Sequence, residues 1–149
     1  MKFEKRNIYP QVFLHDCEIC GFEIKDGESI FHFPEGYCVA AEERTKPNAQ
    51  IVIPCDISDL LEVCSAKRLC IFGRKSPVYR YKYLTVKQLQ KFLVKNRLIM
   101  EEEFYTGQSA VYWRGVVQTG RHYTRYGDNF FEIRIYVDDD IPIIYRYEV

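Results

Sequence analysis

Residues 78–93 read VYRYKYLTVKQLQKFL, and within this stretch the spacing of side chains changes from that of a strand to that of a helix. At its start, aromatic residues alternate with Arg80 and Lys82, which predicts a β-strand because successive side chains of a strand point to opposite faces. Thr85 is followed three residues later by Gln88, which matches the capping box found where helices begin. The stretch therefore predicts a strand that leads directly into a helix.

The predicted helix spans about residues 85–97 and has two distinct sides. Its apolar side is formed by residues at helical spacing, which are Val86, Leu89, Phe92 and Leu93. Lysines step by four residues along another side, at Lys87, Lys91 and Lys95. At 100° per residue the lysine row lies roughly 150° from the centre of the apolar side. We therefore expect this helix to pack on one side and to expose three lysines.

Short strands are expected on both sides of this stretch. Asp26-Gly27 lies between two apolar runs and predicts a β-hairpin. A second helix is expected over about residues 57–67, capped by Asp56 or Ser58. Three further strands are expected in the C-terminal part, at residues 110–117, 130–137 and 141–147. These elements predict an α+β fold, with mostly antiparallel sheet, two helices at about 57–67 and 85–97, and a C-terminal three-strand β region.

Length and composition are typical of one folded domain. The chain has 149 residues, of which 47% are hydrophobic and 28% charged, and this excludes collagen-like and disordered classes. We expect a single domain over residues 1–149, with subdomains 1–72 and 73–149 as the alternative division. The sequence shows neither a secretory signal nor a stretch of about 18 apolar residues, so we expect a cytoplasmic protein without membrane contact, with reduced thiols.

Charge is distributed in three blocks although the net charge is zero. Residues 1–64 carry a net −6 and residues 98–149 a net −4, whereas residues 65–97 carry ten cations and no acid. This basic block favours a non-enzymatic binding protein whose basic surface engages an anionic partner. The partner is predicted to be a nucleic acid or an acidic protein surface, the latter including inhibitor or immunity-type functions. The predicted binding residues are Arg74, Lys75, Arg80, Lys82, Lys87, Lys91, Lys95, Arg114, Arg121 and Arg125.

The tyrosines of the basic block give it two interpretations. Tyr79, Tyr81 and Tyr83 alternate with cations, which is typical of a surface that stacks nucleic-acid bases. In a strand, however, these tyrosines point to one face and Arg80 and Lys82 to the other. We therefore expect the tyrosines to face the core while the cations face water.

A catalytic alternative rests on the polar connection between the predicted strands 110–117 and 130–137. It contains Arg121, His122, Tyr123 and Arg125. A histidine can act as acid or base while arginines stabilise phosphate charge. The alternative function is therefore a metal-independent ribonuclease centred on these four residues.

Cysteines near the N-terminus raise the question of a metal. Cys17-Glu-Ile-Cys20-Gly has two thiols at the spacing that holds zinc, and Cys38 follows a hairpin. Residues 15–38 resemble a degenerate zinc-ribbon or RING-type knuckle. Such families place a further ligand about three residues after Cys38, where this chain has Ala41. The resemblance implies zinc held by Cys17, Cys20 and Cys38, with a fourth ligand from Cys55, His15 or His32, of which Cys55 is preferred. The alternative is that these thiols are apolar packing residues. Cys64 and Cys70 are expected in the core.

Overall fold

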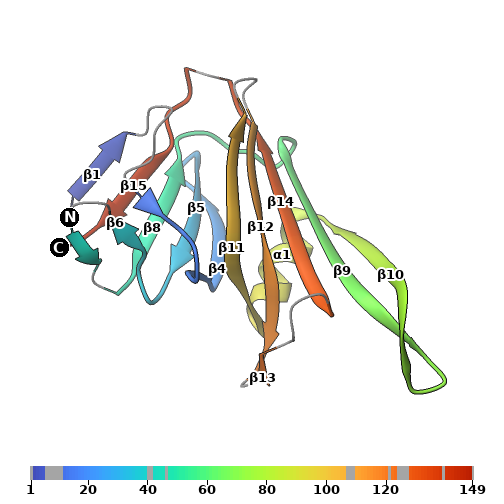
Figure 1. Ribbon diagram of the computed structural model, residues 1–149. Helices are drawn as coiled ribbons and strands as arrows, with labels where there is room; N and C mark the ends of the chain where they lie inside the picture. Colours follow the sequence, from blue (N-terminus) through green and yellow to red (C-terminus); the bar gives the residue numbers. More distant parts are fainter. Residues whose placement is uncertain are drawn as a thin grey trace.

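The structure is a computed structural model that describes residues 2–5, 12–39, 42–45, 47–106, 110–120, 122–123, 128–138 and 140–148. Its strands form antiparallel sheets of five, seven and three strands, and the two large sheets stand side by side with helix α1 (Val86–Leu93) behind them (Figure 1). A mostly antiparallel sheet accompanied by a helix confirms the α+β class in its coarse form. The described part of the chain contains no helix both long and apolar enough to span a membrane.

The five-stranded sheet joins the two ends of the chain. Its order is β1 (Lys2–Lys5), β15 (Ile144–Tyr147), β8 (Ala49–Ile53), β5 (Glu28–Phe33) and β4 (Gly21–Lys25). β4 and β5 form the predicted hairpin, and its turn residues Asp26 and Gly27 have φ angles of 52° and 79°. This left-handed pair of turn residues matches the right-handed twist of the strands, which is why Asp-Gly favours the turn.

The seven-stranded sheet contains the longest strands. Its order is β10 (Arg74–Leu84), β9 (Leu61–Ile71), β14 (Asn129–Tyr136), β12 (Ala110–Thr119), β11 (Asn96–Thr106) and β3 (Glu18–Ile19), and β13 (His122–Tyr123) also pairs with β12. The smallest sheet consists of β2 (Val12–Phe13), β6 (Cys38–Val39) and β7 (Glu42–Arg44). The chain passes from the seven-stranded to the five-stranded sheet within a few residues, between β3 and β4.

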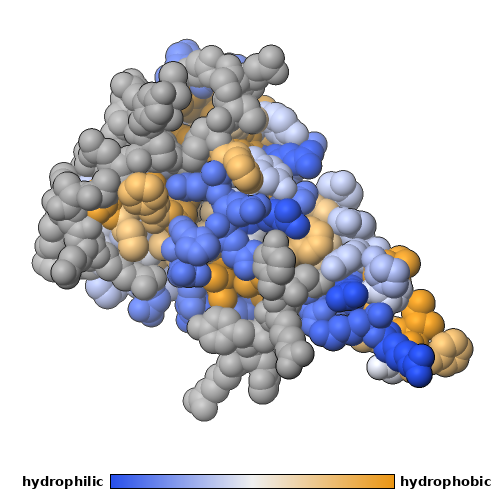
Figure 2. All heavy atoms as spheres, in the orientation of Figure 1, coloured by the Kyte–Doolittle hydropathy of each residue, from blue (hydrophilic) through white to orange (hydrophobic). Residues whose placement is uncertain are grey.

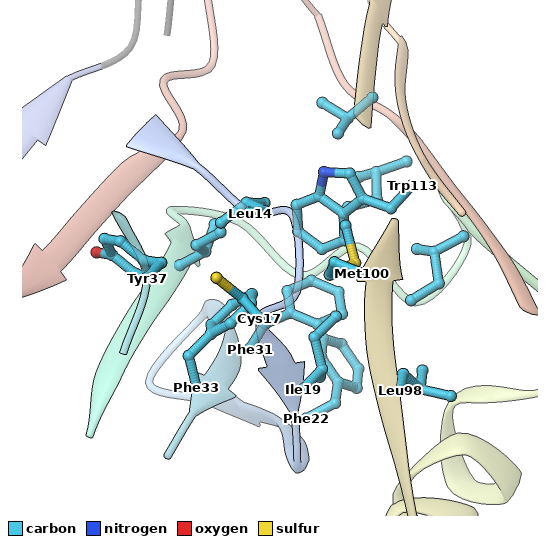
Figure 3. Close-up of a cluster of buried hydrophobic side chains, with 14 of the residues drawn as sticks. Leu14, Cys17, Ile19, Phe22, Phe31, Phe33, Tyr37, Leu98, Met100 and Trp113 are labelled. Atoms are coloured by element: carbon cyan, nitrogen blue, oxygen red, sulfur yellow. The ribbon is translucent and has the colours of Figure 1, made fainter. Parts of the chain in front are cut away.

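A continuous apolar core joins the two large sheets. Phe31 of β5 and Trp113 of β12 meet edge to face, with ring centroids 5.0 Å apart. Figure 3 shows Met100 below Trp113, and it shows the Cys17 side chain among apolar neighbours that include Leu14. Burial of large aromatic side chains dominates the energetics of such a core.

The predicted helix at 57–67 is wrong, because most of this segment belongs to β9. Asp56 does not cap a helix: its carboxylate accepts hydrogen bonds from the backbone N–H and the hydroxyl of Ser58, at 2.8 and 2.6 Å, and so forms a turn. Leu61 then begins a strand that pairs with β14 on one side and with β10 on the other. Two strands supplied from elsewhere in the chain override the helical spacing of the local apolar residues.

The helix predicted at 85–97 is confirmed at its start and is shorter at its end. Thr85 accepts a hydrogen bond from the N–H of Gln88, and the Gln88 side chain accepts from the N–H of Thr85, so the capping box is complete. Its end comes at Leu93, and the Asn96 amide donates to the carbonyl of Phe92 at 2.9 Å. β11 begins at this asparagine.

The C-terminal three-strand region is divided between the large sheets. β12 and β14 are neighbours in the seven-stranded sheet, as predicted. The third predicted strand corresponds to β15, which lies in the five-stranded sheet between β1 and β8.

Strands β9 and β10 extend beyond the rest of their sheet as a two-stranded ribbon (Figure 1, lower right). β14 pairs with β9 only as far as Lys67, and the ribbon continues to a turn at Phe72 and Gly73. β10 is the edge strand of the sheet, and its pairing is interrupted by a bulge between Lys75 and Tyr79. Pro77 lies in this bulge, which is where an edge strand tolerates a residue without an N–H.

Candidate functional site

The cations of the ribbon lie on the face that continues the core side of the seven-stranded sheet. Leu84 is buried in the core, and Lys82 and Arg80 follow it at two-residue steps on the same face of β10. Arg80 lies directly opposite Lys67 of β9, which places Lys67 on this face as well. The inner face of the ribbon therefore changes from apolar to cationic where it passes beyond the core.

Helix α1 adds a second row of cations on the same side of the sheet. The helix buries Leu89 and Leu93 and exposes Lys87 and Lys91, and Lys95 is exposed in the turn after it. Because Thr85 follows Leu84 directly, the helix starts where the inner face of β10 ends. We define the basic surface as the inner-face cations of the ribbon together with the lysines of this row, which are Lys67, Arg80, Lys82, Lys87, Lys91 and Lys95.

Most cations of the basic block are not neutralised by acids. Arg68 and Lys75 both pair with Asp128, and Arg97 pairs with Glu18 at 3.1 Å. The other seven cations of residues 65–97 form no ion pair within the described ranges, and all are exposed: Lys67, Arg74, Arg80, Lys82, Lys87, Lys91 and Lys95. The basic surface therefore keeps its charge although the whole chain is neutral.

The two rows of cations are regularly spaced. Two residues of a strand separate Arg80 from Lys82, a distance of about 6.6 Å along the chain. Four residues of a helix separate Lys87 from Lys91, a rise of about 6 Å. Each strand of duplex DNA carries one charge per roughly 3.4 Å of helix axis, so a row laid along that axis matches the axial spacing of every second phosphate.

The tyrosines lie on the opposite, outer face, and the prediction that they face the core is wrong. Tyr81 is 58% and Tyr83 72% exposed. The ring of Phe130, from β14, lies 5.5 Å from Tyr79 and 6.3 Å from Tyr81. The core lies on the Leu84 face of the sheet, so the opposite face, which carries the tyrosines, meets solvent. We call the exposed aromatic side of the sheet the outer aromatic face, and it includes Tyr79, Tyr81, Tyr83, Phe104, Tyr112, Phe130 and Tyr136.

Cations on the outer aromatic face are balanced by acids. Arg114 lies 3.8 Å from Glu102 and stacks over Phe130, with 5.2 Å from its guanidinium carbon to the ring centroid. Arg134 lies 3.6 Å from Glu132. Arg114 was predicted among the binding residues, but it lies on the face opposite to Arg80 and Lys82. The structure thus separates aromatic side chains and unpaired cations onto different faces.

Tyr112 is the most perturbed ionisable group of the outer face. Burial, followed by a hydrogen bond to Glu132 and the charge of that carboxylate, raises the pKa of Tyr112 to about 12. Arg134 stacks over its ring, 5.5 Å from the centroid. At neutral pH the Tyr112 phenol therefore stays protonated and donates a hydrogen bond to Glu132. This hydrogen bond links β12 to β14 and is structural.

Two predicted binding residues lie next to the turn of the ribbon, outside the basic surface. Arg74 lies opposite Ile71 and is unpaired among the described residues, whereas Lys75 is held by Asp128. Lys75 and Asp128 also line an open pocket of about 350 Å³ at the base of the projecting ribbon. Lys67 and Arg68 line the same pocket, so Asp128 there faces three cations, one of which belongs to the basic surface.

The loop of the ribonuclease alternative is described only in part. Arg121 and Arg125 lie outside the described residues. The backbone of His122 and Tyr123 forms β13, which pairs with the end of β12. The four-residue catalytic arrangement stays a prediction.

The four cysteines of the predicted zinc knuckle have different environments. Cys17 is buried, and its thiol contacts the carbonyl oxygen of His15 at 3.6 Å. Cys20 and Cys55 are partly buried, and Cys38 is exposed. Across the described ranges, no three His, Cys, Asp or Glu side chains form a group that could hold a metal ion. Zinc at these cysteines stays a prediction. Of the two cysteines expected in the core, Cys64 is buried and Cys70 is exposed.

Two residues that bear on function were missed by sequence reasoning. Lys67 was assigned to the predicted helix at 57–67 and was not connected with Arg80. Phe72 is fully exposed at the turn of the ribbon, and its position directly before Gly73 in a turn was the available signal.

No protein-family model, no curated protein and no solved structure matches this chain. The function must therefore be argued from the geometry of the chain itself.

Proposed function

We propose that this protein is a non-enzymatic binding protein whose basic surface engages the phosphate backbone of a nucleic acid. The observation that carries the proposal is the set of six exposed cations on one side of the seven-stranded sheet, which form no ion pair with any residue that the structure describes. Lysines and arginines that displace counterions from phosphates supply most of the affinity in such complexes. Overall neutrality does not oppose this, because the acids of the described residues form no ion pair with these six cations.

An acidic protein surface is the alternative partner, and composition disfavours it. The basic surface contains five lysines and one arginine, and lysine is depleted in protein interfaces whereas aromatic residues and arginine are enriched. The aromatic residues of this sheet lie on the other face, so the basic surface has no buried anchor of the kind that dominates protein binding. Phosphate contacts require only exposed cations at suitable spacing, and the basic surface provides such cations.

The proposal is tested by the salt dependence of binding to a labelled 20-base-pair DNA duplex, followed by fluorescence anisotropy. We expect the logarithm of affinity to fall linearly with the logarithm of salt concentration. Each phosphate contact contributes a slope of about −0.9. Removal of one contacting cation in Arg80→Gln should therefore reduce the slope by about one.

Arg134→Gln is the matched control, because it removes one arginine from the same sheet on the outer face. We expect it to leave the salt slope unchanged. Equal effects of Arg80→Gln and Arg134→Gln would contradict a specific role for the basic surface. Absence of duplex binding by the unsubstituted protein, together with salt-dependent binding to an acidic protein, would reassign the surface to the alternative partner.

The ribonuclease alternative has a separate test. Labelled RNA incubated with the protein, with and without chelator, should remain intact if the protein only binds. Cleavage that persists with chelator and is lost in His122→Ala would favour the ribonuclease alternative.

A further inference from the structure

The end of the projecting ribbon is apolar and fully exposed. Phe72 is 101% exposed, Ile71 is 50% exposed, and Val78 across the ribbon is 53% exposed. Figure 2 shows hydrophobic side chains gathered at the end of the ribbon, beside hydrophilic ones. An isolated exposed apolar residue is ordinary, but Ile71 and Phe72 at the end of a projecting arm, with Val78 farther along it, are typical of a contact element.

The backbone at this end is also unfavourable for its sequence. Phe72 has a φ of 49° and Gly73 a φ of 73°, so both turn residues are left-handed. Glycine and asparagine accept this conformation readily, whereas phenylalanine does not. Phe72 therefore adopts a strained backbone conformation although its side chain is fully exposed. This combination indicates that the side chain serves to contact another molecule.

The position of the basic surface limits what the tip can contact. Lys82 lies opposite Ser65 of β9, seven residues before Phe72, so Phe72 and Lys82 lie about 23 Å apart along the ribbon. If the tip entered a membrane end-on, Lys82 would lie more than two Debye lengths of about 8–10 Å from the lipid headgroups. A partner that lies along the inner face can meet both the cations and the tip.

A double-stranded partner fits this arrangement better than a single strand. Single-strand binding uses several aromatic side chains beside the cations, and the basic surface has none among its six residues. Proteins that grip a duplex by its backbone instead insert single apolar wedges between base steps. The ribbon of β9 and β10 has the same two parts, because cations lie along its inner face and one aromatic residue lies at its tip.

We infer that Phe72, supported by Ile71, is an apolar wedge that inserts between base pairs of duplex DNA held along the basic surface. The inference rests on the proposed function and adds to it the duplex form of the partner and the deformation of that duplex. Arg74 lies beside the wedge, opposite Ile71, where it can contact the phosphates that flank the opened step.

The experiment combines binding with two reports of base-pair opening. Duplexes that carry 2-aminopurine report unstacking, and duplexes with a dye at each end report bending through energy transfer. We expect the unsubstituted protein to raise 2-aminopurine fluorescence and to shorten the distance between the dyes. Phe72→Asn keeps a residue that accepts the turn, and we expect it to lose both signals and to bind roughly tenfold more weakly, as for loss of one base–aromatic contact.

Phe104→Ala is the matched control, because it removes a phenylalanine that is 50% exposed on the outer aromatic face. It should preserve affinity, unstacking and bending. If the unsubstituted protein binds the duplex and Phe72→Asn gives the same signals, the wedge is wrong while the basic surface stands. If the unsubstituted protein binds no duplex, the proposed function and the wedge both fail. Phe72-dependent binding to anionic vesicles without DNA binding would also overturn the wedge.

Discussion

The carbonyl oxygen of Ile99 in β11 occupies the space that a β-carbon on Gly115 of β12 would need. Gly115 lies opposite Met100, next to the bulge in β11 that follows this methionine. Because backbone atoms define this contact, no side-chain rotation can relieve an added methyl group. We expect Gly115→Ala to lower the free energy of unfolding by about 3 kcal/mol, at the upper end for overpacking. Urea unfolding followed by circular dichroism measures this, and a change below about 0.5 kcal/mol would contradict it.

The capping box of α1 contributes less to the free energy of unfolding than Gly115 does, and its contribution can be measured separately. Thr85→Ala removes the acceptor for the N–H of Gln88, and loss of such a cap costs about 1 kcal/mol. Thr85→Ser keeps the acceptor and serves as the control. We expect Thr85→Ala, but not Thr85→Ser, to lower the urea midpoint, because the hydroxyl and not the methyl group makes the cap.

Relief of the strained turn should stabilise the protein. In Phe72→Asn a residue that accepts positive φ replaces one that does not, and its side chain buries nothing in the fold. We expect the free energy of unfolding to rise by about 0.5–1 kcal/mol. Higher stability together with weaker duplex binding would show that Phe72 serves to contact DNA and does not serve to stabilise the fold. Lower stability would mean that Phe72 supports the hairpin.

Thiol reactivity should follow burial. Cys38 and Cys70 are exposed, whereas burial raises the pKa of the Cys20, Cys55 and Cys64 thiols. Because the thiolate is the reactive form, we expect the two exposed thiols to react first with an alkylating reagent at pH 8. Mass spectrometry of partly labelled protein identifies the order. Zinc added beforehand that protects Cys38 together with the other three predicted ligands would support the zinc knuckle, and unchanged labelling would count against it.

Stability at high pH should depend on Tyr112. Its pKa is raised from 10.0 to about 12, so the folded state favours the protonated phenol. The resulting stabilisation is fully present below pH 10 and is lost as pH rises toward 12, because the unfolded phenol ionises first. Tyr112→Phe should remove this part of the pH dependence. Urea midpoints at pH 9 and 11 should therefore differ less in Tyr112→Phe than in the unsubstituted protein.

Features with local chemical causes were predictable from the sequence. The reciprocal hydrogen bonds of Thr85 and Gln88, and the left-handed turn at Asp26 and Gly27, depend only on residues within a few positions. The alternation of residues 78–83 correctly placed tyrosines and cations on opposite faces. Each of these follows from backbone geometry that a short segment determines by itself.

Features decided by distant strands were not predictable. Leu61 and Cys64 fit a helix by spacing, yet β14, more than sixty residues later, and β10 pair with this segment and make it a strand. Alternation shows that the tyrosines of β10 share a face, but which face is covered depends on the packing of distant elements against Leu84. The basic surface was therefore predicted as a set of cations, whereas its membership and orientation required the fold.

The direct junction of β10 and α1 fixes the distance between the two rows of cations. Four residues, 83–86, separate Lys82 from Lys87; among them Leu84 is buried in the core and Thr85 forms the cap. The rows cannot move apart without exposing the leucine or breaking the cap. The backbone positions of the two rows are consequently fixed relative to each other, so the nucleic-acid contact that we propose should depend on the geometry of the partner's charges. A flexible polyanion with the same number of charges should bind more weakly than a stiff one, because it must lose conformational entropy to match the fixed rows of cations.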